Sequence, residues 1–441
     1  MTKIGFISLG CSKNTVDTEV MLHRLMSAGY EITPEPTEAD IVVINTCAFI
    51  ESAKQESIDN ILDVAYLKEH HSLQGIVVCG CLGERYGAQI LEEMPEVDAV
   101  LGTGSYDDIV EAVRAVEKKQ KGYFSHKDKN EAVLGGERVL TTGESMAYLK
   151  IAEGCDNCCT YCAIPLIRGR FRSRPMEDII AEARELDSMG VKEINIIAQD
   201  TSRYGLDLYG EYKLAELVER ILEATDIPWI RLLYLYPDKI TDELIEVIKN
   251  NDRVVKYADI PIQHISDRIL KAMNRHGDGA MIRDAIARLR AAIPDITLRT
   301  TAIVGFPGET EEDFEELCEF VKETKFDRFG AFTYSQEEDT AAAELDGQID
   351  EQTKQDRYDV IMREQLYISA DKTAQMVGKT VRVFCEGYDP VSETYFGRSE
   401  GDAPDVDGKI FFTSGKKLSD GVFVDVIITE ALDYDLIGRA L

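Results

Sequence analysis

The sequence predicts an α/β protein in three parts: an open parallel sheet, a partial barrel of six β/α units, and a small antiparallel β-barrel. Short β-rich runs alternate with helical patterns twice, over residues 1–118 and again over 145–352. Such alternation is typical of parallel sheets covered by helices. Residues 377–441 instead carry short strand patterns separated by Asp-Gly and Ser-Gly turns, which predicts the small antiparallel barrel.

The first part is predicted to contain four strand–helix pairs. The strands are expected at residues 3–9, 41–45, 75–79 and 99–101, and the helices at 15–28, 51–68, 84–94 and 107–118. Their order predicts an open parallel sheet with helices on both faces. Residues 119–144 are polar, contain glycine and lack periodicity, so they are predicted to be a linker.

The second part repeats the pattern six times. Its strands are expected at residues 148–152, 193–198, 229–235, 257–262, 297–304 and 326–332, and its helices at 176–188, 214–224, 242–249, 279–291 and 311–322. Six units fall short of the eight in a complete barrel. Residues 353–376 are predicted to form a connecting helix, and the last part is expected to have strands at 380–386, 394–399, 409–413 and 421–431.

Length and composition narrow the class of protein. A chain of 441 residues has room for about two to four domains. No apolar run approaches the roughly 20 residues that span a bilayer, and the first apolar stretch is interrupted by Gly5 and Ser8, so no signal peptide is predicted. We expect a cytoplasmic protein without membrane contact. The net charge of −32 disfavours broad nucleic-acid binding.

Cysteines form a cluster at the start of the central part. Cys155, Cys159 and Cys162 have the spacing C-x-x-x-C-x-x-C in a loop after a predicted strand. Thiolates are the usual protein ligands of iron–sulfur clusters, and three thiolates on a four-iron cube leave one iron open. Structural zinc, with Cys158 as a fourth ligand, is one alternative, and a disulfide framework is another.

The spacing of these cysteines inside a β/α series resembles the radical S-adenosylmethionine (SAM) superfamily. This resemblance implies that the open iron chelates the amino and carboxylate groups of SAM, and that reductive cleavage then yields a 5′-deoxyadenosyl radical. The protein positions the cofactor and excludes water.

Other polar residues near this motif are weaker candidates. The run Arg168, Arg170, Arg172 and Arg174 either contacts the SAM carboxylate or the substrate, or forms a solvated loop. Gln199 and His264 each follow a predicted strand, where barrel enzymes place functional groups, but either is equally compatible with a structural role.

A glycine-containing loop follows the fifth strand of the central part. The segment from Gly305 through Gly308 to Glu309 resembles the loop on the SAM side of the superfamily's barrel. Gly308 would allow close backbone approach at this point. These three residues are therefore the candidates for cofactor binding, and no catalytic residue is assigned.

Three further cysteines lie at the ends of predicted strands in the first part. Cys11, Cys47 and Cys81 each follow a strand, about 35 residues apart. Parallel strands end on the same edge of an open sheet, where ligands gather, so these thiols are expected to meet at a second cluster site. Burial as ordinary core cysteines is the alternative, and it is the one favoured for Cys79, Cys318 and Cys385.

With both groups of cysteines in view, the chain resembles the radical SAM methylthiotransferases. The Gly-Cys, Asn-Thr-Cys and Gly-Cys segments, the central motif and a C-terminal barrel of the TRAM type occur in the family's order. The resemblance implies that Cys11, Cys47 and Cys81 hold a second 4Fe–4S cluster beside that of Cys155, Cys159 and Cys162. It also implies that two SAM molecules serve as methyl donor and radical source while a methylthio group replaces a hydrogen.

The family has a protein-modifying and a tRNA-modifying branch. Residues 395–408 look like the branch that modifies the β-carbon of an aspartate in ribosomal protein S twelve. The final barrel has 7 Lys and Arg against 12 Asp and Glu, a net charge of −5, which suits a basic protein substrate better than RNA. We therefore expect ribosomal protein S twelve as partner, with a reducing partner such as flavodoxin or ferredoxin, and regard tRNA as disfavoured.

Two other functions stay open at this point. A tRNA (adenosine) methylthiotransferase is the nearest, and a zinc-stabilised RNA-binding protein is a more distant one. If the chain modifies ribosomal protein S twelve, three acidic residues of the final barrel, Asp402, Asp405 and Asp407, are expected to form a rim that docks this basic substrate.

Overall fold

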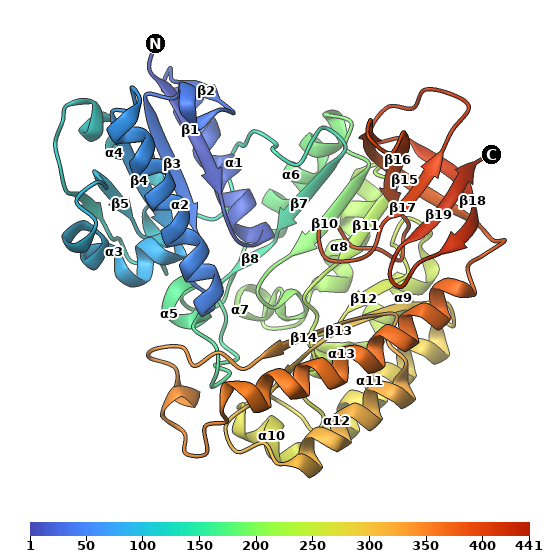
Figure 1. The fold of residues 1–441 in the computed structure, drawn as a ribbon. Coiled ribbons are helices and arrows are strands. Elements are labelled where there is room, and N and C mark those ends of the chain that lie inside the picture. Colours follow the sequence, from blue (N-terminus) through green and yellow to red (C-terminus); the bar gives the residue numbers. More distant parts are fainter.

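The computed structural model describes residues 1–441. Its N-terminal part contains a six-stranded parallel sheet (Figure 1). The strands run in the order β2-β1-β3-β4-β5-β6. Their bounds are β1 Lys3–Ser8, β2 Glu31–Thr33, β3 Ile41–Thr46, β4 Gly75–Gly80, β5 Ala99–Leu101 and β6 Tyr123–Ser125. The central strands β3 and β4 are buried along their whole length, as expected for strands covered on both faces.

Helices cover both faces of this sheet. They are α1 Ser12–Ser27, α2 Glu51–His70, α3 Cys81–Glu93 and α4 Ile109–Glu117. One core joins α1 and α4 to the sheet, and another joins α2 and α3 to the opposite face. Short 3-10 turns lie at Pro36–Glu38 and Thr103–Asp108.

The central part has six parallel strands, and strands that follow one another along the chain lie side by side. They form two three-stranded sheets, β11-β10-β7 and β12-β13-β14. The bounds are β7 Met146–Lys150, β10 Glu193–Ile197, β11 Trp229–Leu232, β12 Tyr257–Asp259, β13 Thr297–Val304 and β14 Arg328–Thr333. Between the two sheets, the Leu235 N–H donates to the Asp259 carbonyl at 2.9 Å.

Helices lie on the outside of these strands. They are α5 Ile164–Arg168, α6 Met176–Ser188, α7 Leu206–Tyr209, α8 Leu214–Ala224, α9 Asp242–Asn250, α10 Asp267–Ala272, α11 Gly279–Ala292, α12 Glu311–Thr324 and α13 Glu351–Ala374. Strands β8 Ala152–Glu153 and β9 Arg172–Ser173 pair as a short antiparallel ribbon. Short 3-10 turns lie at Thr201–Arg203, Pro237–Lys239 and Ala341–Glu344. No helix is both long and apolar enough to cross a bilayer.

The C-terminal part is a closed five-stranded barrel, in the order β15-β16-β17-β19-β18. Its strands are β15 Thr380–Asp389, β16 Thr394–Arg398, β17 Ile410–Thr413, β18 Phe423–Ala431 and β19 Leu436–Ala440. Four of the five pairings are antiparallel, but β17 and β19 pair in parallel. The last strand and its parallel pairing were not predicted from the sequence.

The N-terminal sheet and the C-terminal barrel flank the central part (Figure 1). The strands expected in the first two parts are present, while β2 and β6 are additional. Both have three residues, too few to show the alternation by which a strand is predicted. Strand β6 lies in the segment predicted as a linker, and Arg138 of the same segment pairs with Glu19 of α1 and Glu182 of α6 at 2.9 and 3.0 Å.

The loop 399–407 attaches the C-terminal barrel to the central strands. Asp402 pairs with Arg328 of β14, and the Asp407 carboxylate accepts a hydrogen bond from the Tyr257 hydroxyl at 2.6 Å. Both carboxylates are buried, so the expectation that they belong to a free docking rim is wrong. Asp405 is exposed, although it accepts a hydrogen bond from the Tyr148 hydroxyl at 3.0 Å.

Candidate functional site

The N-terminal cysteines gather at one edge of the six-stranded sheet. Cys11 precedes α1, Cys47 directly follows β3, and Cys81 directly follows β4 as the first residue of α3. A Cβ added to Gly10 would lie 2.8 Å from the Cys47 Cβ. The loop of Cys11 therefore packs against Cys47, and only glycine fits between them.

The ionisation of Cys81 and that of Cys47 depend on each other. A hydrogen bond from Cys47, assisted by the charge of Arg168, outweighs burial and lowers the pKa of Cys81 to about 6. The same contact, together with burial and the charge of Cys11, raises the pKa of Cys47. The surroundings of Cys81 thus favour its thiolate, which is the form of cysteine that binds iron.

Asparagine side chains connect the loops that carry the N-terminal cysteines. The Asn14 side-chain amide donates to the Leu9 and Thr46 carbonyls at 2.9 Å each, and the Asn45 amide donates back to the Asn14 carbonyl at 3.0 Å. The Ser57 hydroxyl bonds the Cys47 backbone N–H at 3.0 Å and donates to its carbonyl at 2.8 Å. The Asn45-Thr46-Cys47 segment is therefore fixed on both sides.

The central cysteines lie in the loop between β8 and α5. Cys155 and Cys159 are buried and Cys162 is partly buried. Burial raises the pKa of Cys155 to about 12 and also raises that of Cys162, and Cys159 contributes to both shifts. Cys158 is exposed, with a φ of 50°.

Polar and aromatic side chains brace this loop from the barrel side. The Asn157 amide donates to Asp200 at 2.7 Å, and Lys239 donates to the same carboxylate at 2.8 Å. The Tyr236 hydroxyl lies 3.8 Å from the Cys159 sulfur, and the Arg275 guanidinium lies over the Tyr236 ring at 4.3 Å. None of these bracing residues was singled out by the sequence, because their partners come from separate β/α units.

The glycine-containing loop after β13 is anchored by Glu309. Its buried carboxylate accepts from the Gly305 and Phe306 backbone N–H groups at 2.8 and 3.2 Å, and Arg357 of α13 donates to it at 3.0 Å. A Cβ on Gly305 would lie 2.4 Å from Lys354, whereas a Cβ on Gly308 would meet only the Arg268 guanidinium, at 3.8 Å. Glu309 and Gly305 thus shape the loop from behind, and Gly308 is the predicted residue that leaves room for a ligand.

The remaining sequence candidates have structural contacts. Gln199 donates to Glu153 at 2.6 Å, and the His264 ring accepts from the Ser266 N–H at 3.0 Å. Arg172 donates to two backbone carbonyls and Arg174 to one. Only Arg170 of the basic run is exposed, where it pairs with Asp156 at 2.7 Å.

The thiols of both cysteine groups are the kind of donor that binds iron–sulfur clusters. Cationic side chains lie beside two of them: Arg168 near Cys81, and Arg275 near Cys159. No group of three His, Cys, Asp or Glu side chains is spaced for one metal ion.

Three family models match the chain in sequence. An uncharacterized protein family, UPF0004, matches residues 3–102, the radical SAM superfamily matches 149–321, and the TRAM domain matches 377–441. The chain is 49% identical over its whole length to the ribosomal protein uS12 methylthiotransferase RimO of Acetivibrio thermocellus, covering 98% of that protein. It is 48% identical to the protein of the same name from Geobacter sulfurreducens, over all of this chain and 98% of that one.

The chain belongs to the uS12 methylthiotransferase family. It is therefore a radical SAM enzyme that transfers sulfur, and family membership implies SAM and 4Fe–4S clusters as cofactors. The prediction of this family from its cysteine motifs and its C-terminal barrel is confirmed.

Solved structures share the fold at low sequence identity. The radical SAM methyltransferase TsrM of Kitasatospora setae has a TM-score of 0.54 at 13% identity, over 75% of this chain and 73% of that one. The cobalamin-dependent SAM radical enzyme OxsB also has a TM-score of 0.54 at 13% identity, over 83% of this chain and 56% of that one. The predicted fold class, including the closed C-terminal barrel, is confirmed.

Proposed function

We propose that this chain replaces a hydrogen on the β-carbon of an aspartate in ribosomal protein uS12 with a methylthio group. One observation carries the proposal: a single chain has two separate sets of three cysteines, one at the ends of parallel strands and one in the loop between β8 and α5. A methylthiolation needs a site for sulfur and a site for radical generation. The full-length similarity to proteins named uS12 methylthiotransferases supports the choice of substrate.

Cys11, Cys47 and Cys81 would hold one 4Fe–4S cluster, and Cys155, Cys159 and Cys162 the other. When bound, the clusters and SAM supply the sulfur, the methyl group and the radical. The chain's own residues do the positioning: Asn14 and Asn45 fix the first triad, while Asn157, Tyr236 and Arg275 brace the loop of the second. Gly308 leaves space beside the loop after β13 for part of SAM.

The C-terminal barrel as a whole has a net charge of −5. Its exposed acidic residues are Glu393, Glu400, Asp405, Asp420, Asp425, Glu430 and Asp433. Its exposed basic residues are Lys379, Arg382, Lys409, Lys416, Lys417 and Arg439. The exposed charges therefore nearly balance, and the choice of a protein substrate rests on the full-length similarity to uS12 methylthiotransferases. We propose that this barrel docks uS12 in the cytoplasm, and that a flavodoxin or ferredoxin supplies the electrons.

A parallel assay tests the proposal. Reconstituted protein, SAM and a chemical reductant are incubated with purified uS12 and, separately, with unmodified tRNA. Mass spectrometry of uS12 is expected to show the gain of one methylthio group in place of hydrogen on a single aspartate, with no modified adenosine in the tRNA. Modification of tRNA with unmodified uS12 would refute the proposal.

The Cys47→Ala variant separates the two sites in the same assay. It is expected to cleave SAM to 5′-deoxyadenosine and to leave uS12 unmodified, because only the sulfur site is lost. A folded variant that no longer forms 5′-deoxyadenosine would contradict this division of labour.

A further inference from the structure

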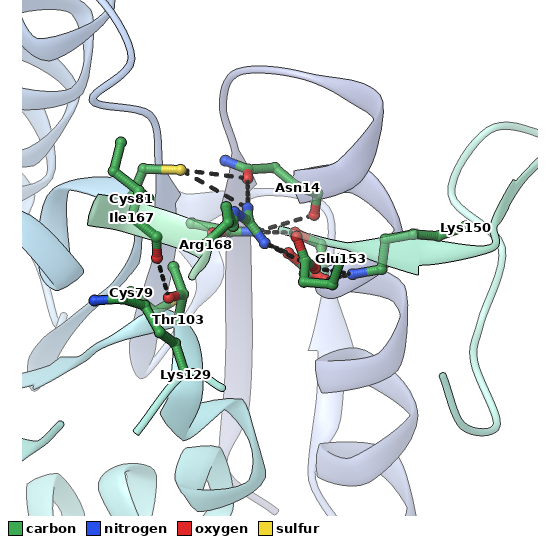
Figure 2. Close-up of polar contacts among 12 residues, drawn as sticks. Asn14, Cys79, Cys81, Thr103, Lys129, Lys150, Glu153, Ile167 and Arg168 are labelled. Carbon is green, nitrogen blue, oxygen red and sulfur yellow. Dashed lines mark hydrogen bonds and ion pairs between the residues drawn. The ribbon is translucent and has the colours of Figure 1, made fainter. Parts of the chain in front are cut away.

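A buried ion network joins the N-terminal sheet to the central part, beside Cys81 (Figure 2). Two anions, Asp17 of α1 and Glu153 of β8, face two cations, Lys150 of β7 and Arg168 of α5. Each side chain is less than 10% exposed. Burial alone would raise the pKa of Glu153, but Lys150 and Arg168 lower it to about 2, so the network is held fully charged.

Arg168 has contacts beyond this network. One guanidinium nitrogen donates to Asp17 at 2.6 Å and lies 3.4 Å from Glu153. The other donates to Asn14 and lies 3.7 Å from the Cys81 sulfur, as Figure 2 shows. Asn14 is the same side chain that bonds the loops of Cys11 and Cys47. A residue of the central part thus reaches Cys81 of the N-terminal triad.

The chain around Arg168 also contacts the second triad. The carbonyl of its neighbour Gly169 accepts from the Cys155 backbone N–H at 3.1 Å. The carbonyl of Ile167 on its other side accepts from the Thr103 hydroxyl of the N-terminal part at 2.7 Å. The end of α5 is therefore fixed to both cysteine sites, which holds the guanidinium in one place against Cys81.

We propose that Arg168 is a positioning residue that raises the reduction potential of the cluster held by Cys11, Cys47 and Cys81. This inference rests on the proposed function for its assignment of that cluster. Hydrogen bonds to cluster sulfurs and nearby charge set such potentials. A reduced cluster carries one more negative charge than an oxidised one, so a guanidinium beside Cys81 stabilises the reduced form, and burial strengthens the effect.

The network also makes this effect depend on the contact between the two parts. Arg168 is held in place by Asp17 and Asn14, which belong to the N-terminal part, and by Glu153, which belongs to the central part. The potential of the sulfur-site cluster is therefore set by a residue that reaches it only when the sheet and the barrel are docked. Docking and redox poise are coupled through one side chain.

The test measures the potential of the N-terminal cluster by itself. In the full-length chain, changing Cys155, Cys159 and Cys162 to Ala leaves only that cluster, and its midpoint is read by redox titration followed by electron paramagnetic resonance. Adding Arg168→Gln is expected to lower the ratio of reduced to oxidised cluster at a fixed potential at least tenfold, a shift of about 59 mV to more negative values for one electron.

Two further variants complete the experiment. Arg168→Lys keeps the charge beside Asp17 and Glu153 but loses the planar fork that reaches Cys81 at the same time, so a smaller shift in the same direction is expected. Arg170→Gln removes an exposed arginine of the same run and is expected to leave the midpoint unchanged.

The outcomes separate this inference from the proposed function. If the parent variant with Cys155, Cys159 and Cys162 replaced binds no four-iron cluster, the ligand assignment fails and the proposed function fails with it. If the cluster is present and Arg168→Gln has the parent's midpoint, only the role of Arg168 is refuted. Should Arg168→Gln fail to fold, Arg168→Lys decides: an unchanged midpoint refutes the inference, and a negative shift supports it.

Discussion

The two cysteine triads have the same ligand chemistry but are assembled in opposite ways. Cys155, Cys159 and Cys162 lie within eight consecutive residues, whereas Cys11, Cys47 and Cys81 come from three loops of a parallel sheet. Local turns can bring the first set together, but separate strand ends meet only when the sheet has formed. The N-terminal site therefore depends on a whole domain, and the central site depends on one loop and its braces.

Removing one cysteine from each triad gives the largest expected effects. Anaerobically prepared wild-type protein is expected to hold about eight irons, and Cys159→Ala and Cys47→Ala about half as many each. Only Cys159→Ala is expected to lose SAM cleavage, because it removes the radical site. Iron and sulfide analysis with an assay for 5′-deoxyadenosine checks both variants. Stoichiometric zinc without sulfide in the wild-type protein would overturn the assignment of both triads.

A glycine before a cysteine in each triad tests the difference in assembly. Gly80 has a φ of 91°, and a Cβ there would lie 2.4 Å from Asn45 and 2.5 Å from the Thr46 carbonyl. Gly154 has a φ of 78°, and a Cβ there would lie 2.1 Å from the Arg170 carbonyl. Alanine at either position costs roughly 1–2 kcal/mol for the left-handed backbone, and the close contact adds to this cost.

The two substitutions should differ in how far their effects spread. Gly80→Ala is expected to remove the N-terminal irons and to lower the free energy of unfolding of that domain, since it separates β3 from β4. Gly154→Ala is expected to remove only the central irons. Gly190→Ala, with a φ of 91° and open space around the Cβ, controls for backbone strain. Full iron content in both variants would show that neither site depends on these close contacts.

The ease of predicting the two sites follows from how they are built. The central motif is contiguous, so its spacing alone indicates the ligands. The N-terminal triad could be predicted because parallel strands end on one edge. In the structure the loop of Cys11 packs against Cys47, and Cys81 follows the neighbouring strand β4. Assignment of the clusters to these six cysteines stays a prediction, since only spectroscopy of the loaded protein tests it.

Contacts between domains could not be predicted from the sequence. Arg168 stands in a basic run whose pattern does not distinguish a solvated arginine from one that reaches Cys81. The acidic segment 402–407 has the composition of a surface loop, yet Asp402 and Asp407 are buried against central strands. Charge patterns indicate which residues are ionised, but only packing between domains decides which charges are paired.

Asp402 and Asp405 test this point with a smaller expected effect. The Asp402 carboxylate pairs with Arg328 and accepts from the Ser399 hydroxyl at 2.6 Å. Asp402→Asn leaves a largely buried guanidinium without its anion, which is expected to cost about 3 kcal/mol of unfolding free energy. The exposed Asp405, changed to Asn, is expected to cost less than about 1 kcal/mol. Chemical denaturation compares the two variants.

The docking rim predicted from the sequence would give the opposite result. In that case Asp402→Asn would keep wild-type stability and would change only the affinity for uS12 and its salt dependence. Equal denaturation midpoints for Asp402→Asn and the wild-type chain would therefore restore that hypothesis. A loss of stability confined to Asp402→Asn would confirm that the Asp402 carboxylate holds the barrel against the central strands.

The smallest expected effect concerns two buried groups of the central part that titrate in opposite directions. Burial lowers the pKa of His264 to about 4, and burial raises the pKa of Glu309 to about 7. The His264 Nε2 and a Glu309 oxygen are 3.8 Å apart. The folded state favours a neutral imidazole, so the contribution of His264 is complete above its unfolded pKa of about 6.5 and is lost as the pH falls toward 4.

Glu309 has the opposite sign, because burial favours its neutral acid by more than Arg357 and the two backbone N–H groups favour its anion. The contribution of Glu309 to stability is complete below its unfolded pKa of about 4.3 and is lost as the pH rises through 7.

Between pH 5 and 6.5 the slopes of stability against pH from His264 and Glu309, each at most about 1.4 kcal/mol per pH unit, should nearly cancel in the wild-type chain. His264→Gln is then expected to lose stability as the pH rises, and Glu309→Gln as the pH falls. Denaturant unfolding at four or five pH values measures both slopes, and the double variant should be flat again. Parallel pH profiles in the two single variants would mean that folding shifts neither pKa in this range, and that Glu309 is an anion held by Arg357.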